Sequence, residues 1–274
     1  MFTLNCKGRL LLINRPVVMG IINATPDSFY SGSRQQSVDG ALQKAGIMLG
    51  EGATLLDIGG QSTRPGSATL NQEEELKRVL PAIEAINQQF SECFISIDTY
   101  YSKVAREAVA HGASLVNDIS GGSFDPAMPA TVASLQVPYV CMHVKGTVET
   151  MHESPAYENI TQEVLDYFIQ KIASFTDAGI NDIIIDPGFG FSKNSAHNFE
   201  LLKNLEVFQL LKRPLLLGIS RKSTIYKTLG ITAEEALNGS TVLHTAGLLK
   251  GASILRVHDV KEAVEAVTLT QYLR

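Results

Sequence analysis

The stretch IIIDPGFGF, residues 183–191, decides which fold is expected for this chain. Three successive isoleucines are typical of a strand buried on both faces, and the run ends in a carboxylate, Asp186. A carboxylate that leaves water without a partner is costly, so something must bind this acid. Pro187 and Gly188 follow it, and no helical pattern begins for several residues. Helix capping therefore explains Asp186 poorly, and contact with a ligand is the better interpretation.

Apolar runs of this kind recur at regular intervals along the 274 residues. Most show little polar alternation, which predicts strands of a parallel sheet covered on both faces. Helical patterns fill the intervals between them, because apolar residues return there with three- and four-residue spacing. The runs are residues 17–22, 54–58, 94–98, 114–118, 138–142, 182–186, 214–218 and 252–256, and the helical patterns lie at or near 38–50, 71–90, 101–111, 127–135, 158–178, 196–211, 233–250 and 259–272.

Eight alternating β and α units predict an α/β fold, the TIM (β/α)8 barrel. On pattern alone, an open doubly wound sheet is the alternative. The first fifteen residues lie outside the repeat, and CKGR at 6–9 between two apolar runs predicts a β-hairpin at the bottom of the barrel. We expect a single domain over 1–274, with the N-terminal hairpin at 1–15 and the barrel at 16–274.

Composition limits the function classes. The chain is 45% hydrophobic with a formal net charge of −5, which gives no footprint for nucleic acid. It has no run of 18 apolar residues, so no membrane span is expected. Its N-terminus lacks the layout of a signal peptide, and Cys6, Cys93 and Cys141 form no CxxC pair. These features predict a cytoplasmic protein that acts on small molecules.

Polar side chains stand at the carboxyl end of nearly every expected strand. Active sites of α/β barrels are built at that end, so these side chains are candidates for one shared site. For Asp98, capping of the following helix is an open alternative, and for Asp57 hydrogen bonding within its loop is another. The polar residues at the strand ends are Asn23, Asp57, Asp98, Asn117, His143, Asp186, Ser220 and Arg256.

Basic residues near two of these strand ends indicate an anion site. Arg64, Arg256 and His258 together would suit a phosphate or a pyrophosphate. The alternatives are a solvated loop charge for Arg64 and, for Arg256, a salt bridge to Asp259 or to an acid at the barrel rim. SRKST at 220–224 begins a helix whose free N–H groups can bind a carboxylate or a phosphate. The histidines lack the spacing of a zinc site.

Seven segments of the sequence point to one family. Together they resemble the motifs of the dihydropteroate synthase family, in the same order and over nearly the whole chain. The resemblance implies that p-aminobenzoate displaces pyrophosphate from 6-hydroxymethyl-7,8-dihydropterin diphosphate to give 7,8-dihydropteroate, a transferase reaction of folate biosynthesis. It also implies a homodimer and competition by sulfonamides. The segments are MGIINATPDSFYSG, LLDIGGQSTRPGS, FISIDTYYSKVAREAV, LVNDISGG, DPGFGF, GISRKS and ILRVHDV.

The resemblance also implies roles for individual residues, which divide by the part of the substrates that each contacts. The pterin-binding residues would be Asp98, Asn117, Met142, Asp186, Phe191, Lys222 and Arg256. The diphosphate-binding residues would be Asn23, Arg64, Arg256 and His258, and Asn23 would also coordinate Mg²⁺. The p-aminobenzoate site would include Phe29, Ser62, Thr63, Pro65, Lys222 and Ser223. The residues expected to take part in the chemistry are Asn23, Asp98, Lys222 and Arg256.

The expected mechanism is a Mg²⁺-assisted dissociative displacement, in which Asp98 steadies positive charge on the pterin and segments 23–33 and 59–67 close over it. Without ligand, Asp186 should have few protein donors. Two alternatives are a methyltetrahydrofolate-dependent methyltransferase domain and a non-catalytic pterin-binding protein. Neither needs the STRPG, SRKS and RVH segments together. One departure from the family pattern is Ser192, which stands where the family usually has glycine.

Overall fold

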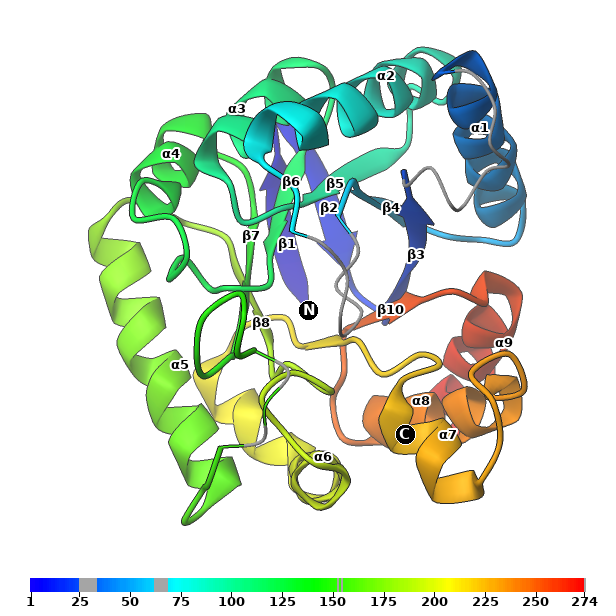
Figure 1. Cartoon of the computed structure of the whole chain (residues 1–274). Helices are drawn as coiled ribbons and strands as arrows, with labels where there is room; N and C mark the ends of the chain where they lie inside the picture. Colours follow the sequence, from blue (N-terminus) through cyan, green and yellow to red (C-terminus); the bar gives the residue numbers. More distant parts are fainter. Residues whose placement is uncertain (25–33, 62–68, 152, 154, 274) are drawn as a thin grey trace.

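Parallel strands form the wall of a barrel in the computed structural model, which describes residues 1–24, 34–61, 69–151, 153 and 155–273 (Figure 1). The hydrogen-bonded strand order is β8-β7-β6-β5-β4-β3-β10-β9. A parallel bridge between Ile185 and Leu215 then joins the two ends of this sheet. The TIM barrel is therefore confirmed and the open sheet is wrong. The strands are β3 (Val17–Asn23), β4 (Leu55–Gly59), β5 (Phe94–Asp98), β6 (Leu115–Asp118), β7 (Tyr139–Met142), β8 (Ile183–Asp186), β9 (Leu216–Leu217) and β10 (Ile254–Val257).

Helices surround this wall (Figure 1). The expected helix near 196–211 is divided at Asn204, because residues 205–211 form a 3-10 helix, η2, that buries Leu205 and Phe208 at its three-residue spacing. None of the described helices is long and apolar enough to cross a membrane. The helices are α1 (Arg34–Gly50), α2 (Gln72–Gln89), α3 (Ser102–Ala110), α4 (Met128–Leu135), α5 (Ile160–Asp177), α6 (Ser195–Lys203), α7 (Ser223–Leu229), α8 (Leu237–Leu249) and α9 (Val260–Thr270), with short 3-10 helices η2 (Leu205–Leu211) and η3 (Gln271–Leu273).

The expected hairpin is present. Strands β1 (Phe2–Cys6) and β2 (Arg9–Ile13) pair antiparallel around Lys7 and Gly8, which both have positive φ as a tight hairpin turn requires. Its inner side chains pack against residues that line the barrel interior. The hairpin thus covers the bottom of the barrel, as the sequence predicts.

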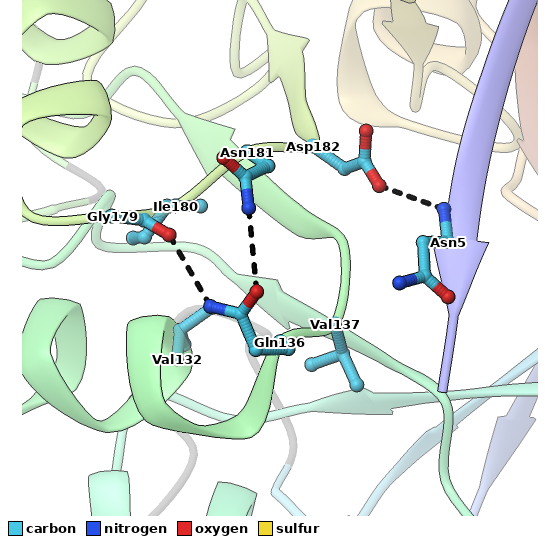
Figure 2. A pocket seen from close by; sticks show the side chains of 8 residues that line it. All are labelled: Asn5, Val132, Gln136, Val137, Gly179, Ile180, Asn181 and Asp182. Atoms are coloured by element: carbon cyan, nitrogen blue, oxygen red, sulfur yellow. Dashed lines mark hydrogen bonds between the residues drawn. The ribbon is translucent and has the colours of Figure 1, made fainter. Parts of the chain in front are cut away.

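A small pocket lies beside this hairpin, far from the carboxyl ends of the strands (Figure 2). Its lining includes Asn5, Gln136 and Asp182, and the last of these immediately precedes β8. The carboxylate of Asp182 already accepts from the Asn5 backbone N–H at 2.7 Å, and Gln136 bonds Asn181. We read this pocket as part of the junction between hairpin and barrel, since its polar groups bond one another.

The interior of the barrel is layered by the two-residue period of its strands. The bottom layer is apolar and takes one side chain from each strand, in contact with the hairpin. The side chain two positions further along the strand faces the same interior but lies closer to the mouth, so this second layer decides what the mouth contains. The bottom layer is Met19, Leu55, Phe94, Leu115, Val140, Ile184, Leu216 and Ile254. The second layer is Ile21, Asp57, Ser96, Asn117, Met142, Asp186, Gly218 and Arg256.

An acid is buried between the barrel and α2. Glu75 is 1% exposed, and neither of its carboxylate oxygens makes a hydrogen bond of normal geometry to the described residues, although Thr99 lies near enough to oppose the rise of its pKa. It lies beneath Gly60, where an added Cβ would come within 3.0 Å of the Glu75 Cγ. Burial raises the pKa of Glu75 to about 8, so the folded protein keeps this group protonated at neutral pH.

Replacing Glu75 should therefore change how stability depends on pH. Between the ordinary pKa of 4.5 and about 8, the folded protein holds a proton that the unfolded chain releases, so stability falls as pH rises through this window. Glu75→Gln lacks that proton and should gain stability over wild type toward pH 8, by an amount on the order of a few kcal/mol. Urea unfolding at pH 5, 6.5 and 8 measures the difference.

The control is Glu73→Gln, which changes an exposed acid on the same turn of α2. Its difference from wild type should stay constant with pH. The interpretation of Glu75 is wrong when its variant and wild type show the same pH dependence.

Candidate active site at the barrel mouth

Arg256 is the central cation of the mouth. Its Nε donates to Asp57 Oδ2 at 2.6 Å, and its NH2 group donates to Asp98 Oδ2 at 2.6 Å. The arginine comes from β10 and the acids from β4 and β5, on the other side of β3. Burial alone would lower the pKa of Arg256, but the carboxylates of Asp57 and Asp98 raise it overall. The guanidinium is therefore a permanent charge that ties three strands together.

Asp57 is the most deeply buried residue of this group. It is fully buried, and its Oδ2 also accepts from Asn117 Nδ2 at 2.9 Å. Its Oδ1 has no hydrogen-bond partner. The amide of Asn117 is therefore fixed with its nitrogen toward Asp57, and its carbonyl oxygen is left to accept from another group.

Asp98 is the more open of the two acids bound to Arg256. Its side chain is 14% exposed and that of Asp57 is 0% exposed. Burial raises the pKa of Asp98 to about 7 even though Arg256 acts in the opposite direction, and the nearby carboxylates of Asp57 and Asp118 add to the rise. Because the carboxylate is costly to keep charged here, a cationic group arriving beside it would be attracted strongly.

Asp186 and Lys222 form a second group of opposite charges. Asp186 Oδ1 accepts from the Gly188 backbone N–H at 2.8 Å, and Oδ2 takes no hydrogen bond from the described residues. A Cβ added at Gly218 would lie 3.6 Å from Asp186 Oδ2 and 4.0 Å from Lys222 Nζ, so this bare glycine leaves room between them. The expectation that Asp186 has few protein donors is therefore met. Burial raises the pKa of Asp186, opposed first by the charge of Lys222.

Lys222 borders an apolar wall. Its Nζ donates to the Phe189 carbonyl and stands 4.6 Å from the centre of the Phe191 ring. Burial lowers the pKa of Lys222 to about 8, and the Asp186 carboxylate acts in the opposite direction. Phe191 packs with Met142 in one buried cluster, which also contains Tyr100, Ile119, Val144 and Met151. Polar groups on one side and an apolar wall on the other are the usual arrangement of a site for a flat heterocycle.

The remaining described candidates lie around this centre. Asn23 ends β3, is half-buried, and makes no side-chain hydrogen bond to the described residues. His258 follows β10, and both its backbone N–H and its Nδ1 lie 3.2 Å from Ser220 Oγ. Ser223 is the first residue of α7. Five sequence candidates, Phe29, Ser62, Thr63, Arg64 and Pro65, lie outside the described residues.

Two alternatives raised by the sequence are now resolved. Asp259 does not pair with Arg256, because both its oxygens accept from Arg221 at 2.8 Å. The partners of Arg256 are instead acids of the barrel mouth. Asp98 does not cap α3, since the residue before that helix is Tyr101, which makes no side-chain capping bond. Asp98 is thus free of the capping role, whereas Arg256 does form salt bridges to acids at the barrel mouth, which was the other alternative for this residue.

Sequence reasoning missed two members of the mouth. It left hydrogen bonding within the loop open for Asp57 and gave this residue no role in the site, although the period of β4 places it in the second interior layer with Asn117 and Arg256. It passed over Lys193, whose buried Nζ contacts the turn after Asp186. The signal for Asp57 was available in the strand period, whereas nothing in the sequence singles out Lys193.

The described residues also bear on Mg²⁺. They contain no group of three or more His, Cys, Asp or Glu side chains able to hold a metal ion. Mg²⁺ often uses one or two protein oxygens and takes the rest of its ligands from substrate phosphates and water. The amide oxygen of Asn23, which makes no hydrogen bond to the described residues, fits that pattern, so the residues present are compatible with a metal that shares its ligands with a phosphate group.

The sequence also matches known proteins. Residues 19–258 match the family model described as pterin binding enzyme. The dihydropteroate synthase of Escherichia coli strain K12 is 44% identical over 267 residues, which cover 97% of this chain and 94% of that protein.

Solved structures agree with this match. The dihydropteroate synthase of Yersinia pestis in a complex with a sulfonamide drug has a TM-score of 0.93 and 41% identity, over 100% of this chain and 99% of that one. The enzyme of Xanthomonas albilineans in a complex with 7,8-dihydropteroate has a TM-score of 0.89 and 38% identity, over 99% and 98%.

Loss of the Asp57 charge should destabilise the fold. Asp57→Asn leaves the guanidinium of Arg256 with Asp98 alone, and breaking a buried ion pair costs about 3–5 kcal/mol. We expect the free energy of unfolding, measured with urea at pH 7, to fall by an amount near the lower end of this range, about 3 kcal/mol. The matched control is Glu92→Gln, which removes a 96%-exposed partner of Arg9 and should barely matter. Equal effects of the two variants would contradict this account of the mouth.

Proposed function

This chain belongs to the dihydropteroate synthase family of pterin-binding enzymes, and we propose that its own reaction is the condensation that gives the family its name. The substrates are 6-hydroxymethyl-7,8-dihydropterin diphosphate and p-aminobenzoate, and the products are 7,8-dihydropteroate and pyrophosphate. The chain is a transferase that passes the pterin methylene group to an arylamine.

The observation that carries this proposal is the set of strand ends at the mouth. Asp98, Asn117, Asp186 and Arg256 come from four different strands. Hydrogen bonds through Asp57 join Asn117, Arg256 and Asp98 at the mouth, and Asp186 is the register partner of Met142 in the apolar wall. A pterin ring offers a flat face to such a wall and a polar edge to such acids. The relative from Xanthomonas albilineans binds 7,8-dihydropteroate on the same fold.

The free acceptors match the edge of the pterin. A pterin presents a ring N–H beside an exocyclic amine, and one carboxylate can accept from both. Asp186 has an oxygen available for this, and the carbonyl oxygen of Asn117 can accept from a further donor. Hydrogen bonds to a charged group contribute about 1.5–3 kcal/mol each, so a ligand lacking this edge would bind poorly. Lys222 and Arg256 complete the pterin contacts in this proposal.

The reaction requires no nucleophilic side chain. The bond between the pterin methylene carbon and the diphosphate oxygen breaks first, and the arylamine nitrogen then forms the new C–N bond and releases a proton. Positive charge spreads over the pterin ring at the intermediate stage. The carboxylate of Asp98, at the open side of the Arg256 network, would stabilise this charge. Arg256, with His258 and Arg64 at the rim, would bind the departing diphosphate.

We assign Mg²⁺ to the diphosphate end of the site, with Asn23 as its protein ligand. When bound, the ion would stabilise the negative charge that develops on the leaving diphosphate. Asn23 would orient that group at the end of β3, across from the apolar wall. The support is the donor type and the absence of any hydrogen bond between the amide of Asn23 and the described residues.

p-Aminobenzoate would bind beside the start of α7. Lys222 and Ser223 are the described residues of this subsite, and the lysine charge suits the carboxylate of the substrate. The other assigned residues are Phe29, Ser62, Thr63 and Pro65. A sulfonamide drug binds the Yersinia pestis relative, and we propose that sulfonamides compete with p-aminobenzoate here.

We also propose a homodimer formed through outer helices. Large apolar side chains are exposed on neighbouring helices α7 to α9, among them Leu229 at 56%, Val242 at 57% and Leu269 at 67%. Exposed apolar groups gathered on one side of a protein often mark an interface. Light scattering after gel filtration measures the mass, and a monomer at micromolar concentration would reject the dimer.

A cytoplasmic location is part of the same proposal. The three cysteines are unpaired, and Cys6 and Cys141 are buried, as suits a reducing compartment. Cell fractionation tests it directly.

The reaction itself is tested with purified protein. Given both substrates and Mg²⁺, it should release pyrophosphate and form dihydropteroate in equal amounts. Removal of Mg²⁺ with EDTA should stop turnover, and Asn23→Ala should raise the Mg²⁺ concentration needed for half-maximal rate. Pterin binding without turnover would instead support a non-catalytic pterin-binding protein. Turnover only with a methylated folate would support the methyltransferase.

Asp98→Asn separates binding from chemistry. The amide keeps the shape but loses the negative charge that would stabilise the cationic intermediate, so the single-turnover rate should fall about 100-fold or more. Pterin affinity, measured by calorimetry, should fall less than about tenfold, since Asp186 and Asn117 keep their contacts. Equal losses in rate and affinity would limit Asp98 to a binding role.

A further inference from the structure

Lys193 is a buried lysine with no assigned part in the reaction. It is 7% exposed and follows the turn that leaves β8. Its Nζ lies 3.1 Å from the Gly188 carbonyl, 3.0 Å from the Phe191 carbonyl, 3.3 Å from the His143 carbonyl and 2.9 Å from His143 Nδ1. A lysine this deeply buried normally needs a reason, because burial of an ammonium group is costly.

These contacts join two separate segments. Gly188 and Phe191 belong to the turn after β8, whereas His143 follows the last residue of β7. An ammonium group has three N–H donors, and here four acceptors surround it. The carbonyls can only accept, so a charged Lys193 fixes His143 with an unprotonated Nδ1. His143 itself is held by ring contacts to Tyr157 and Tyr167.

The turn that Lys193 holds is the one that serves the pterin pocket. Gly188 donates to Asp186, the Phe189 carbonyl accepts from Lys222, and the ring of Phe191 forms part of the pocket wall. The pterin contacts proposed for this part of the chain therefore depend on the backbone conformation of residues 186–193.

This shape is not one that the backbone adopts readily by itself. Gly188, Gly190 and Ser192 all have positive φ, at 72°, 81° and 47°, and serine has no glycine-like freedom there. A Cβ added to Gly188 would come within 2.1 Å of the His143 carbonyl oxygen, so the turn is pressed against the end of β7. Side-chain hydrogen bonds must hold such a turn, and Lys193, its last residue, makes more of them to the carbonyls of the turn than any other described side chain.

We propose that Lys193 is a positioning residue for the pterin site, whose ammonium group ties the turn at 186–193 to the end of β7 and so sets the places of Asp186 and Phe191. The inference rests on the proposed function, because it takes Asp186 and Phe191 as pterin contacts. Lys193 touches no substrate. It acts through the carbonyls that it binds.

The surrounding charges fit this role. Burial lowers the pKa of Lys193 to about 7, with Lys222 and Lys145 adding to the fall and Asp186 opposing it. The carboxylate of Asp186 is thus the main charge that keeps Lys193 protonated. The ammonium group of Lys193, for its part, holds the chain segment that follows Asp186. The two groups support each other across one short segment.

The test compares kinetic constants for the two substrates. Lys193→Met keeps the length and apolar stem of the side chain but removes the ammonium group. We expect the KM for the pterin diphosphate to rise at least tenfold and the KM for p-aminobenzoate to change less than twofold. A merely structural defect would lower the amount of active enzyme without separating the two constants.

The matched control is Lys171→Met. Lys171 also lies partly buried and donates to a carbonyl beyond a barrel strand, that of Gly121 at 2.7 Å, but it does not contact the turn at 186–193. This variant should leave both KM values within twofold of wild type. A similar rise in both variants would overturn the proposal.

A second measurement distinguishes the positioning role from a folding defect in Lys193→Met. Lys193→Ala leaves the space of the missing alkylammonium, so added propylammonium should restore part of the lost pterin kcat/KM, with no effect on wild type or Lys171→Met. No rescue in folded Lys193→Ala, or failure of both Lys193 variants to fold even with the amine, would assign the residue to folding and overturn the positioning role. Wild type that neither turns over nor binds 6-hydroxymethylpterin would instead refute the proposed function.

Discussion

The pairing of one guanidinium with two carboxylates is the interaction on which the mouth of this barrel depends. Asp57 is fully buried, and no such acid could remain charged without a cation in contact. Arg256 meets that need and leaves Asp98 as the open arm of the pair. Since the guanidinium stays charged at any ordinary pH, the acids are held in place before a substrate arrives. Preorganised charge of this kind is what a reaction with a cationic intermediate requires.

The position of that pair follows from the layering of the barrel. Each strand gives an apolar side chain to the bottom layer, where the hairpin closes the barrel, and a different side chain two residues later to the mouth. The apolar layer supplies much of the stability of the barrel. The mouth can therefore hold polar groups that serve a ligand. Asp186 shows this division well, because Ile184 fills the bottom layer while the acid after Ile185 keeps an oxygen that has no donor among the described residues.

Much of this architecture is encoded in local sequence, and the strand ends were predictable for that reason. Apolar runs form buried strands, and in a strand each side chain faces either the barrel interior or the surrounding helices. Asp98, Asn117 and Asp186 could therefore be assigned to the mouth. The partners could not be assigned in the same way. The pairing of Asp57 with Arg256 joins residues 199 positions apart, and it depends on barrel closure bringing β10 beside β3. Lys193 was harder still, because three of its four acceptors are backbone carbonyls, which carry no sequence signal.

Charge balance then limits how the diphosphate can be bound. The acids of the mouth are Asp57, Asp98 and Asp186, with the fully buried Asp118 nearby, and the cations around them are Arg256, Lys222 and Lys193. Each cation already has carbonyl or carboxylate partners, so this set has little positive charge to spare. A diphosphate that meets Arg256 must therefore be neutralised mainly by further positive charge from outside the set. That requirement supports the proposed metal ion and rim groups. Under this proposal a balanced interior would recognise the pterin and a cationic edge would release the leaving group.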